Sequence, residues 1–257
     1  MEKVKLIEKA INKIDRLIRE QLPDSKYQFE LYDLITNTKY FRGDDEPFHW
    51  GSVYKLFLVA ETIKMSEDGL VDMNNEILLR RQLFVNGNGI IKYLNHLDRL
   101  TFTDACKLTI AVSDNLCADE LLDVVGVERL NNLFYKAGCK SSKLTLNLDS
   151  MVKSLFAGID NIEGASFYHS KKYFNLFDKS LGELLKNNYT TASDVNTCFE
   201  FVTNSYLSRK GQNLLMQFIL TPNVHTRIAA CTFFSNYLLR GKTGALGFGI
   251  ANSETAA

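Results

Sequence analysis

The sequence predicts an α+β fold in which an antiparallel sheet built from N- and C-terminal strands packs against a mostly helical region. Strand-like patterns lie near both ends of the chain, and helical periodicity dominates the long stretch between them. Apolar residues make up 46% of the 257 residues, which is enough to form a substantial core. Neither a linker nor an internal repeat is visible, so we expect a single domain over 1–257.

The chain opens with a helix and then a strand hairpin. Residues 3–22 carry apolar side chains at helical spacing between charged ones, which predicts an amphipathic helix that ends at Pro23. Residues 27–32 alternate in the manner of a strand, a turn follows at 36–38, and residues 39–42 are expected to pair back. The hairpin forms the N-terminal part of the predicted sheet.

The middle of the chain reads as a series of helices. Their predicted ranges are 52–65, with Ser52 at its N-terminus, 103–112, with Thr103 as its cap, 115–124, 127–137, 191–204 and 211–220. Residues 147–187 form the least regular part, and strands are expected at 236–239 and after Gly244. The single domain is therefore expected to comprise an α/β part (1–50 and 206–257) and an all-helical part (51–205).

Charge and composition exclude several classes of function. Thirty basic residues balance thirty acidic ones, and a general nucleic-acid or membrane-surface binder would need a basic excess. No apolar run is long enough to span a bilayer, and the charged N-terminus does not have the pattern of a signal peptide. We expect a cytoplasmic protein as numbered, or an exported one if a leader was removed.

The five cysteines are widely spaced and form no CxxC pair, so we interpret them as mostly buried free thiols. The cysteines and the four histidines show no metal-ligand spacing, and neither a metal nor a cofactor is expected.

A serine and a lysine three residues apart begin the predicted helix 52–65. Positions i and i+3 lie on one face of a helix, so Lys55 can reach the Ser52 hydroxyl. A serine needs a base to become nucleophilic, and the lysine must be neutral to serve as that base. Burial and the cationic Lys242 nearby would both lower the pKa of Lys55. The helix N-terminus also leaves the Ser52 N–H available to a developing oxyanion.

Two further motifs follow in order. Ser113–Asp114–Asn115 comes after the predicted helix 103–112, where a polar triplet is ordinarily a cap and turn. Lys242–Thr243–Gly244 comes after the predicted strand 236–239, and Gly244 permits close backbone approach. One S-x-x-K alone carries little information, but all three motifs in order resemble the set found in class A β-lactamases and penicillin-binding proteins. The resemblance covers roughly residues 25–250, and it implies the β-lactamase/transpeptidase-like arrangement of the predicted α+β fold.

The resemblance also implies roles for the remaining residues. Ser52 would be the acylated nucleophile, with Lys55 as its activating partner and Ser113 relaying a proton to the leaving nitrogen. Asn115 would bind the substrate amide, whereas Lys242 and Thr243 would bind its carboxylate beside Gly244. Ala245 would supply the second oxyanion donor. The implied partner is a small acyl substrate such as a β-lactam or a D-Ala-D-Ala-like peptide.

The sequence departs from the family in two places. The family's E-x-x-L-N run, whose glutamate activates water for deacylation, is not found, and the nearby carboxylates are Asp149, Asp160 and Glu163. The family also adds two strands and a long helix after the third motif, whereas this chain ends at Ala257. The missing glutamate implies an acyl-enzyme that persists, whereas the short ending would leave strand edges unpaired, at a cost to stability and to the geometry of the cleft.

Three alternatives to a β-lactamase-like enzyme stay open. A non-catalytic relative would retain the fold and motifs without forming an adduct. A D,D-peptidase or esterase would share the acylation step but use another acceptor. A Ser–His–Asp triad would need His169, His225 or His49, and the lysine already at helical spacing disfavours it.

Overall fold

The computed structural model describes residues 2–44, 46–80, 89–147, 150 and 187–219, and the backbone of two strands at 241–246 and 251–256. The helices are α1 (Glu2–Gln21), α2 (Tyr54–Glu67), α3 (Phe102–Ala111), α4 (Asn115–Val125), α5 (Val127–Ala137), α8 (Ala192–Phe201) and α9 (Arg209–Ile219). A 3₁₀ turn, Ile91–Tyr93, precedes α3, and a π-helical turn, Val202–Tyr206, follows α8. The strands are β1 (Gln28–Asp33), β2 (Thr38–Gly43), β3 (Phe48–His49), β4 (Glu76–Leu78), β5 (Arg99–Thr101), β6 (Tyr189–Thr190), β7 (Gly241–Leu246) and β8 (Ala251–Ala256).

The predicted helices are present, with shifts at two starts. Helix α2 begins at Tyr54, so Ser52 lies in the preceding turn, and the N-cap is Val53, which makes no side-chain cap. Helix α3 is capped by Thr101, whose hydroxyl accepts from the Asp104 N–H at 3.0 Å. Thr103, the predicted cap, instead donates to the Met73 carbonyl. The observed cap, Thr101, is two residues before the predicted one, because β5 ends at Thr101 and leads directly into the helix.

The strands confirm the α+β class and pair antiparallel. Four two-stranded ladders join β1 with β2, β3 with β6, β4 with β5 and β7 with β8. The sequence predicts one sheet that contains both N- and C-terminal strands. Among the described residues, the N-terminal strands β1 and β2 and the C-terminal strands β7 and β8 form separate ladders. In the β7–β8 ladder, the paired residues run from Leu246 with Ala251 to Gly241 with Ala256, so the two strands are close in sequence. Closing such a short connection costs little chain entropy. The strand predicted at 236–239 lies outside the described residues.

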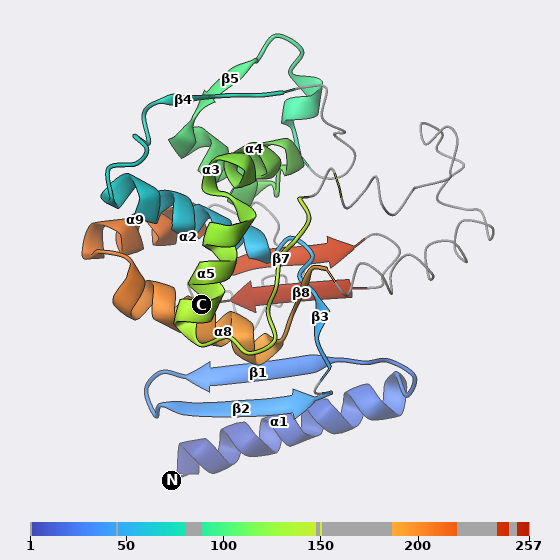
Figure 1. Ribbon diagram of the computed structural model, residues 1–257. Helices are drawn as coiled ribbons and strands as arrows, with labels where there is room; N and C mark the ends of the chain where they lie inside the picture. Colours follow the sequence, from blue (N-terminus) through green and yellow to red (C-terminus); the bar gives the residue numbers. More distant parts are fainter. Residues whose placement is uncertain are drawn as a thin grey trace, which may run out of the picture.

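Helix α2 runs through the centre of the helical part. Almost every residue from Tyr54 to Met65 is buried, because the helix is apolar on all sides and other elements surround it. The fully buried rings of Trp50, Phe57 and Phe134 pack beside its start, with Trp50 stacked on Phe134 at a centroid distance of 5.0 Å. Figure 1 shows α2 among α3, α4, α5 and α9, while α1 and the β1–β2 hairpin lie together at the end of the molecule opposite β4 and β5.

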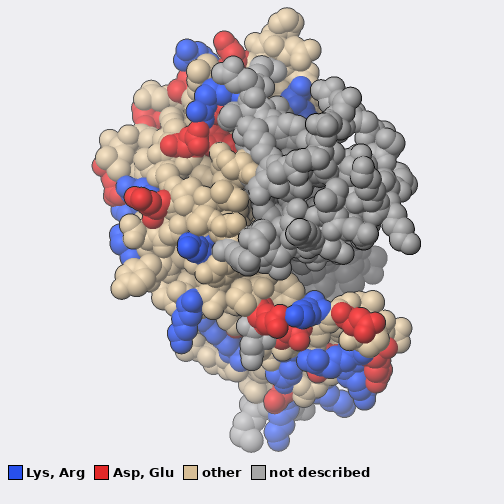
Figure 2. Space-filling model, turned by 45° about the vertical axis from the view of Figure 1, so that its right-hand side comes forward, with Lys and Arg blue, Asp and Glu red and all other residues tan. Residues whose placement is uncertain are grey.

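Charges of both signs lie close together on the surface. On the face shown in Figure 2, basic and acidic side chains are interspersed over the described atoms, which agrees with the balanced composition. On α1 several of them pair along the helix, such as Arg19 with Asp15 at 3.1 Å. Among the residues that the structure describes, no helix is long and apolar enough to cross a membrane.

Candidate active site

The amine of Lys55 lies at the junction between α2 and the turn that starts α4. Its side chain is fully buried, and Nζ donates to the Ser113 carbonyl at 2.7 Å and to Asn115 Oδ1 at 2.7 Å. Nζ also lies 3.3 Å from Ser113 Oγ and 3.4 Å from the Asp114 carbonyl. The structure therefore joins the first and second sequence motifs through one lysine.

Burial shifts the pKa of this amine strongly. Removal from water disfavours the ammonium form and lowers the pKa of Lys55 to about 7, although the carboxylates of Asp119 and Asp114 oppose the shift. Lys242 is also expected to lower the pKa of Lys55, but its side chain lies outside the described residues. A substantial fraction of Lys55 is thus neutral near pH 7, which is the form that accepts a proton.

Ser52 sits in a tight turn that is shaped by Gly51 and His49. Gly51 adopts a left-handed φ of 52°, which glycine reaches without a Cβ penalty. The Gly51 N–H donates to His49 Nδ1 at 2.9 Å, and burial lowers the pKa of His49 to about 4. His49 is therefore neutral and engaged with backbone. A role for it as the base of a triad is not supported by this geometry, and His169 and His225 lie outside the described residues.

The Ser52 N–H differs from those of its two neighbours. Gly51 and Val53 both donate their N–H groups within the turn, whereas within the described part of the chain the Ser52 N–H has no acceptor. Ser52 and Ser113 are each 8% exposed, so solvent still reaches both residues while Lys55 is sealed beneath them.

The Ser52 hydroxyl and the Lys55 amine do not hydrogen-bond in this structure, contrary to the expected contact; among the described residues, Nζ bonds only to the 113–115 turn. Ser52 precedes α2, and the Lys55 N–H donates to the Ser52 carbonyl at 3.3 Å in a 3₁₀-type turn. A catalytic hydrogen bond that is long or absent without substrate can form in the substrate complex.

Asp114 holds the second motif in place. Its Oδ1 accepts from the Leu116 and Cys117 N–H groups as the N-cap of α4, and its Oδ2 accepts from Ile90 at 2.7 Å and Ile91 at 3.0 Å. A Cβ on Gly89 would lie 2.4 Å from Asp114 Oδ2. The carboxylate therefore fixes the loop at 89–91 against the turn that presents Ser113 to Lys55.

Ser113 itself has an unusual backbone. Its φ is 55°, a left-handed value that few non-glycine residues adopt and that costs about 1 kcal/mol or more. This conformation points both its carbonyl and its hydroxyl toward Lys55. Such strain is characteristic of sites where the surrounding structure fixes a residue for function.

The third motif lies on a strand. Residues 242–245 occupy β7, where Lys242 pairs with Thr255 and Ala245 pairs with Asn252. The side chains of Lys242 and Thr243 lie outside the description, so their substrate-binding roles, and those of Gly244 and Ala245, stay predictions. Asp149, Asp160 and Glu163, the carboxylates near the place of the missing E-x-x-L-N run, also lie outside the described residues.

Several supporting residues were not found from the sequence. Trp50 Nε1 donates to the Lys143 carbonyl at 3.1 Å, and the Trp50 N–H donates to the Asn188 carbonyl at 3.4 Å. The Asn188 side chain accepts from Thr145 at 2.8 Å and from Leu146. These contacts fix the chain just before Ser52, but they join residues far apart in sequence, and no local pattern marks them. The capping role of Asp114 could be predicted from the sequence, since an Asp directly before an apolar helix is a typical N-cap.

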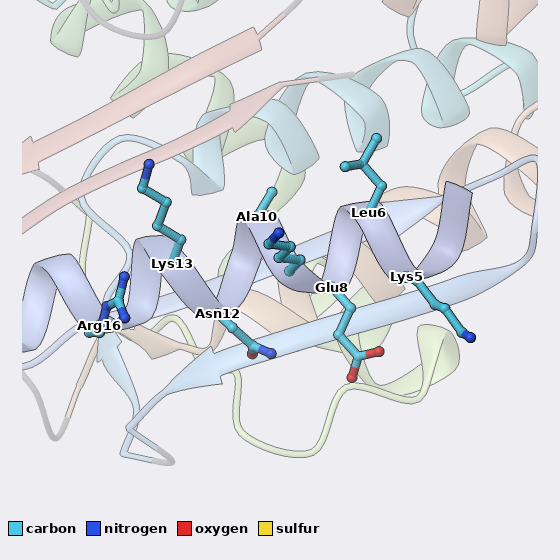
Figure 3. Close-up of a pocket in the computed structure, with 8 residues that line it drawn as sticks. Lys5, Leu6, Glu8, Ala10, Asn12, Lys13 and Arg16 are labelled. Carbon is cyan, nitrogen blue, oxygen red and sulfur yellow. The ribbon is translucent and has the colours of Figure 1, made fainter. Parts of the chain in front are cut away.

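A separate hollow of about 810 Å³ lies along α1 (Figure 3). Its described lining residues all belong to α1 and include Lys5, Leu6, Lys9, Ala10, Lys13 and Arg16. None of these residues belongs to the three motifs, so we place the candidate active site at Ser52, Lys55 and Ser113.

Known proteins resemble this chain over most of its length. A family model described as the β-lactamase enzyme family matches residues 8–254. β-Lactamase CARB-4 of Pseudomonas aeruginosa is 25% identical over 226 residues, which covers 87% of this chain and 68% of that protein. β-Lactamase AER-1 of Aeromonas hydrophila is 20% identical over 220 residues, covering 85% of this chain and 64% of that protein.

Solved structures show the same fold. A mutant of PBP-A in an acyl-enzyme complex with penicillin G superposes with a TM-score of 0.71 at 16% identity, covering 95% of this chain and 81% of that one. An ancestral class A β-lactamase (GNCA) gives a TM-score of 0.72 at 17% identity, covering 94% and 83%. A β-lactamase from Sphaerobacter thermophilus gives 0.67 at 18% identity, covering 93% and 81%. By the extent of the family match and the shared fold, this chain belongs to the β-lactamase enzyme family.

Proposed function

We propose that this protein is an active-site-serine hydrolase that forms an acyl-enzyme with β-lactams or related amides and esters. The observation that carries the proposal is the buried amine of Lys55, which bonds Ser113 and Asn115 and lies three residues after Ser52 in the chain. An amine with its pKa near neutrality, 3.3 Å from the Ser113 hydroxyl, suits proton transfer in acyl transfer.

The acylation step uses Ser52, Lys55 and Ser113 in turn. The Lys55 amine accepts the Ser52 hydroxyl proton as Oγ attacks the carbonyl carbon, and the Ser52 N–H stabilises the resulting oxyanion. The carbonyl C–N bond then breaks, and Ser113 Oγ gives its proton to the departing nitrogen. Lys55, 3.3 Å from that hydroxyl, returns the proton to Ser113. The net result is that one proton moves from the Ser52 hydroxyl to the leaving nitrogen, and Lys55 and Ser113 return to their starting protonation states.

Substrate binding is assigned to the second and third motifs. Asn115 Oδ1 accepts from Lys55, which orients the amide so that its N–H₂ group is the end offered to a substrate carbonyl. Lys242 and Thr243 would bind the substrate carboxylate, and the Ala245 N–H would be the second oxyanion donor. The likeness to a penicillin G acyl-enzyme complex of PBP-A supports a β-lactam as the probe.

Deacylation is proposed to be slow. The sequence has no E-x-x-L-N run after the second motif, and two buried acidic residues have structural roles, since Asp114 accepts four backbone N–H groups and Glu120 pairs with Arg80. A carboxylate so engaged is a poor base for a water molecule. The acyl-enzyme should then persist long enough to be isolated.

A fluorescent penicillin tests the proposal. The protein should acquire a covalent label that survives denaturing electrophoresis, and Ser52→Ala should lose it while remaining folded. Ser25→Ala, which changes an exposed serine in the loop after α1, should label like the parent. A folded parent that acquires no label would leave a non-catalytic relative as the better description.

The type of hydrolase is settled by substrates compared side by side. Nitrocefin and a p-nitrophenyl ester, each given in excess, should produce a stoichiometric burst followed by slow turnover. Rapid nitrocefin turnover without accumulated adduct would contradict slow deacylation and indicate an efficient β-lactamase. Rapid ester turnover alone would indicate the esterase alternative.

A further inference from the structure

Two cysteine thiols that the proposed reaction does not use meet between α5 and α8. Cys139 directly follows the left-handed Gly138 that ends α5, and Cys198 lies on the buried side of α8. Both are free thiols, Cys198 buried and Cys139 partly exposed. They are 59 positions apart in sequence, which makes their meeting a product of the fold.

Contacts with α8 fix the position of the Cys139 sulfur. Cys139 Sγ donates to the Asp194 carbonyl at 3.4 Å, and Asp194 lies one helical turn before Cys198 on the same face. The Asp194 carbonyl is also the i→i+4 acceptor of the Cys198 N–H within α8, so the two cysteines contact the same peptide group. They therefore lie beside each other in the reduced protein.

The Asp194 carboxylate prevents this segment from moving away. It accepts from the Lys140 N–H at 3.0 Å, from the Ser141 N–H at 2.6 Å and from the Ser142 hydroxyl at 2.9 Å. Three hydrogen bonds directly after Cys139 therefore hold the chain on the first turn of α8. A disulfide here would join two positions that the fold already holds beside each other.

We infer that Cys139 and Cys198 form a reversible intramolecular disulfide when a small-molecule disulfide is present as oxidant. The thiolate of the more accessible Cys139 attacks the oxidant, RSSR, and releases one RSH, leaving a mixed disulfide at Cys139. The Cys198 sulfur then attacks Cys139 Sγ, and the second RSH leaves. The two thiols lose two electrons and two protons, and the oxidant is reduced to two RSH molecules.

The other described cysteines differ from this pair. Cys106 and Cys117 are buried, and burial raises the pKa of Cys106 to about 12. Burial also raises the pKa of Cys198, so the second exchange step is expected to be the slower one. Of the four described cysteines, Cys139 alone combines partial exposure with a neighbouring thiol.

The crosslink would tie together the framework around the candidate site. It would close the chain between residues 139 and 198 and link α5 to α8. The segment it fixes includes Lys143, whose carbonyl accepts from Trp50 Nε1, two residues before Ser52. Oxidation should therefore stabilise the folded state by restricting the unfolded chain.

The test treats the full chain with excess oxidised glutathione and then alkylates the remaining thiols in denaturant. Mass spectrometry of the intact protein should show two fewer alkylation sites, and digestion should yield one linked peptide pair containing Cys139 and Cys198. The melting temperature should rise and return to its starting value after reduction with dithiothreitol. Cys139→Ser, whose hydroxyl can still donate to Asp194, should fold but show neither change.

Three outcomes would overturn the inference. These are full alkylation of all five cysteines after oxidation, a linked peptide joining any other pair, and a mixed glutathione disulfide at Cys139 that never resolves. Because penicillin labelling at Ser52 is not part of the readout, the result is independent of the proposed enzymatic function.

Discussion

At the scale of single residues, Lys55 determines what this site can do. A fully buried amine with its pKa lowered to about 7 is costly to protonate, yet it is surrounded by acceptors from the Ser113–Asn115 turn. The S-x-x-K spacing predicted its position, and its burial could be expected from the apolar helix around it. Its contact with the Ser113 carbonyl depends on a left-handed φ at Ser113, which no sequence pattern indicates.

The lowered pKa of Lys55 predicts a pH dependence of stability. The unfolded lysine titrates near its ordinary value of about 10.4, so between about pH 7 and 10 the unfolded chain binds a proton that the folded protein does not. This group therefore makes the free energy of unfolding rise with pH by up to about 1.4 kcal/mol per pH unit, a contribution that is lost as the pH falls toward 7. Urea unfolding between pH 7 and 9 should show this slope, and Lys55→Met should lack it. Equal slopes in the two proteins would mean that Lys55 does not titrate in this range.

At the scale of elements, the turn between α3 and α4 links the loop at 89–91 to the candidate site. Its anchor is Asp114, which caps α4 and accepts from Ile90 and Ile91. The sequence predicted α4 with nearly its observed bounds, because an apolar run follows an Asp. It did not predict the second pair of hydrogen bonds, since these depend on where residues 89–91 fold back.

Replacement of Asp114 should damage stability more than an ordinary cap mutation. Asp114→Ala leaves four backbone N–H groups without their acceptor, two of them outside the helix, and should lower the free energy of unfolding by about 2 to 4 kcal/mol. Asp104→Ala, at an exposed position in the first turn of α3, is the matched control and should cost less than about 1 kcal/mol. Urea denaturation measures both, and similar losses would show that the extra contacts contribute little.

At the scale of the whole molecule, two regions of different packing are visible. The main core joins α2, α3, α4, α5, α8 and α9 around Trp50 and Phe57. Helix α1 instead rests on the β1–β2 hairpin through Ile11, and keeps Leu6 68% exposed. The α+β class and helix order followed from periodicity alone. The pairing of strands in separate ladders did not, because strand partners are set by tertiary contacts rather than by local pattern.

This difference in packing predicts a difference in local stability. Amides of α1 should exchange with deuterium at least tenfold faster than those of α2, because detaching α1 exposes little of the main core. Hydrogen exchange followed by mass spectrometry under native conditions measures both helices in one experiment. Equal protection of α1 and α2 would show that the two regions unfold as one unit.

The central claim is that Ser52 is acylated with the neutral amine of Lys55 as its proton acceptor. The most direct measurement is the rate of penicillin G adduct formation as a function of pH, followed by intact mass and mapped to a residue by digestion. We predict an adduct on Ser52 whose rate of formation rises with pH through a midpoint near 7, and at least a hundredfold loss of that rate in Lys55→Met. An adduct on another residue, or a rate at Ser52 unchanged by removal of Lys55, would contradict the account.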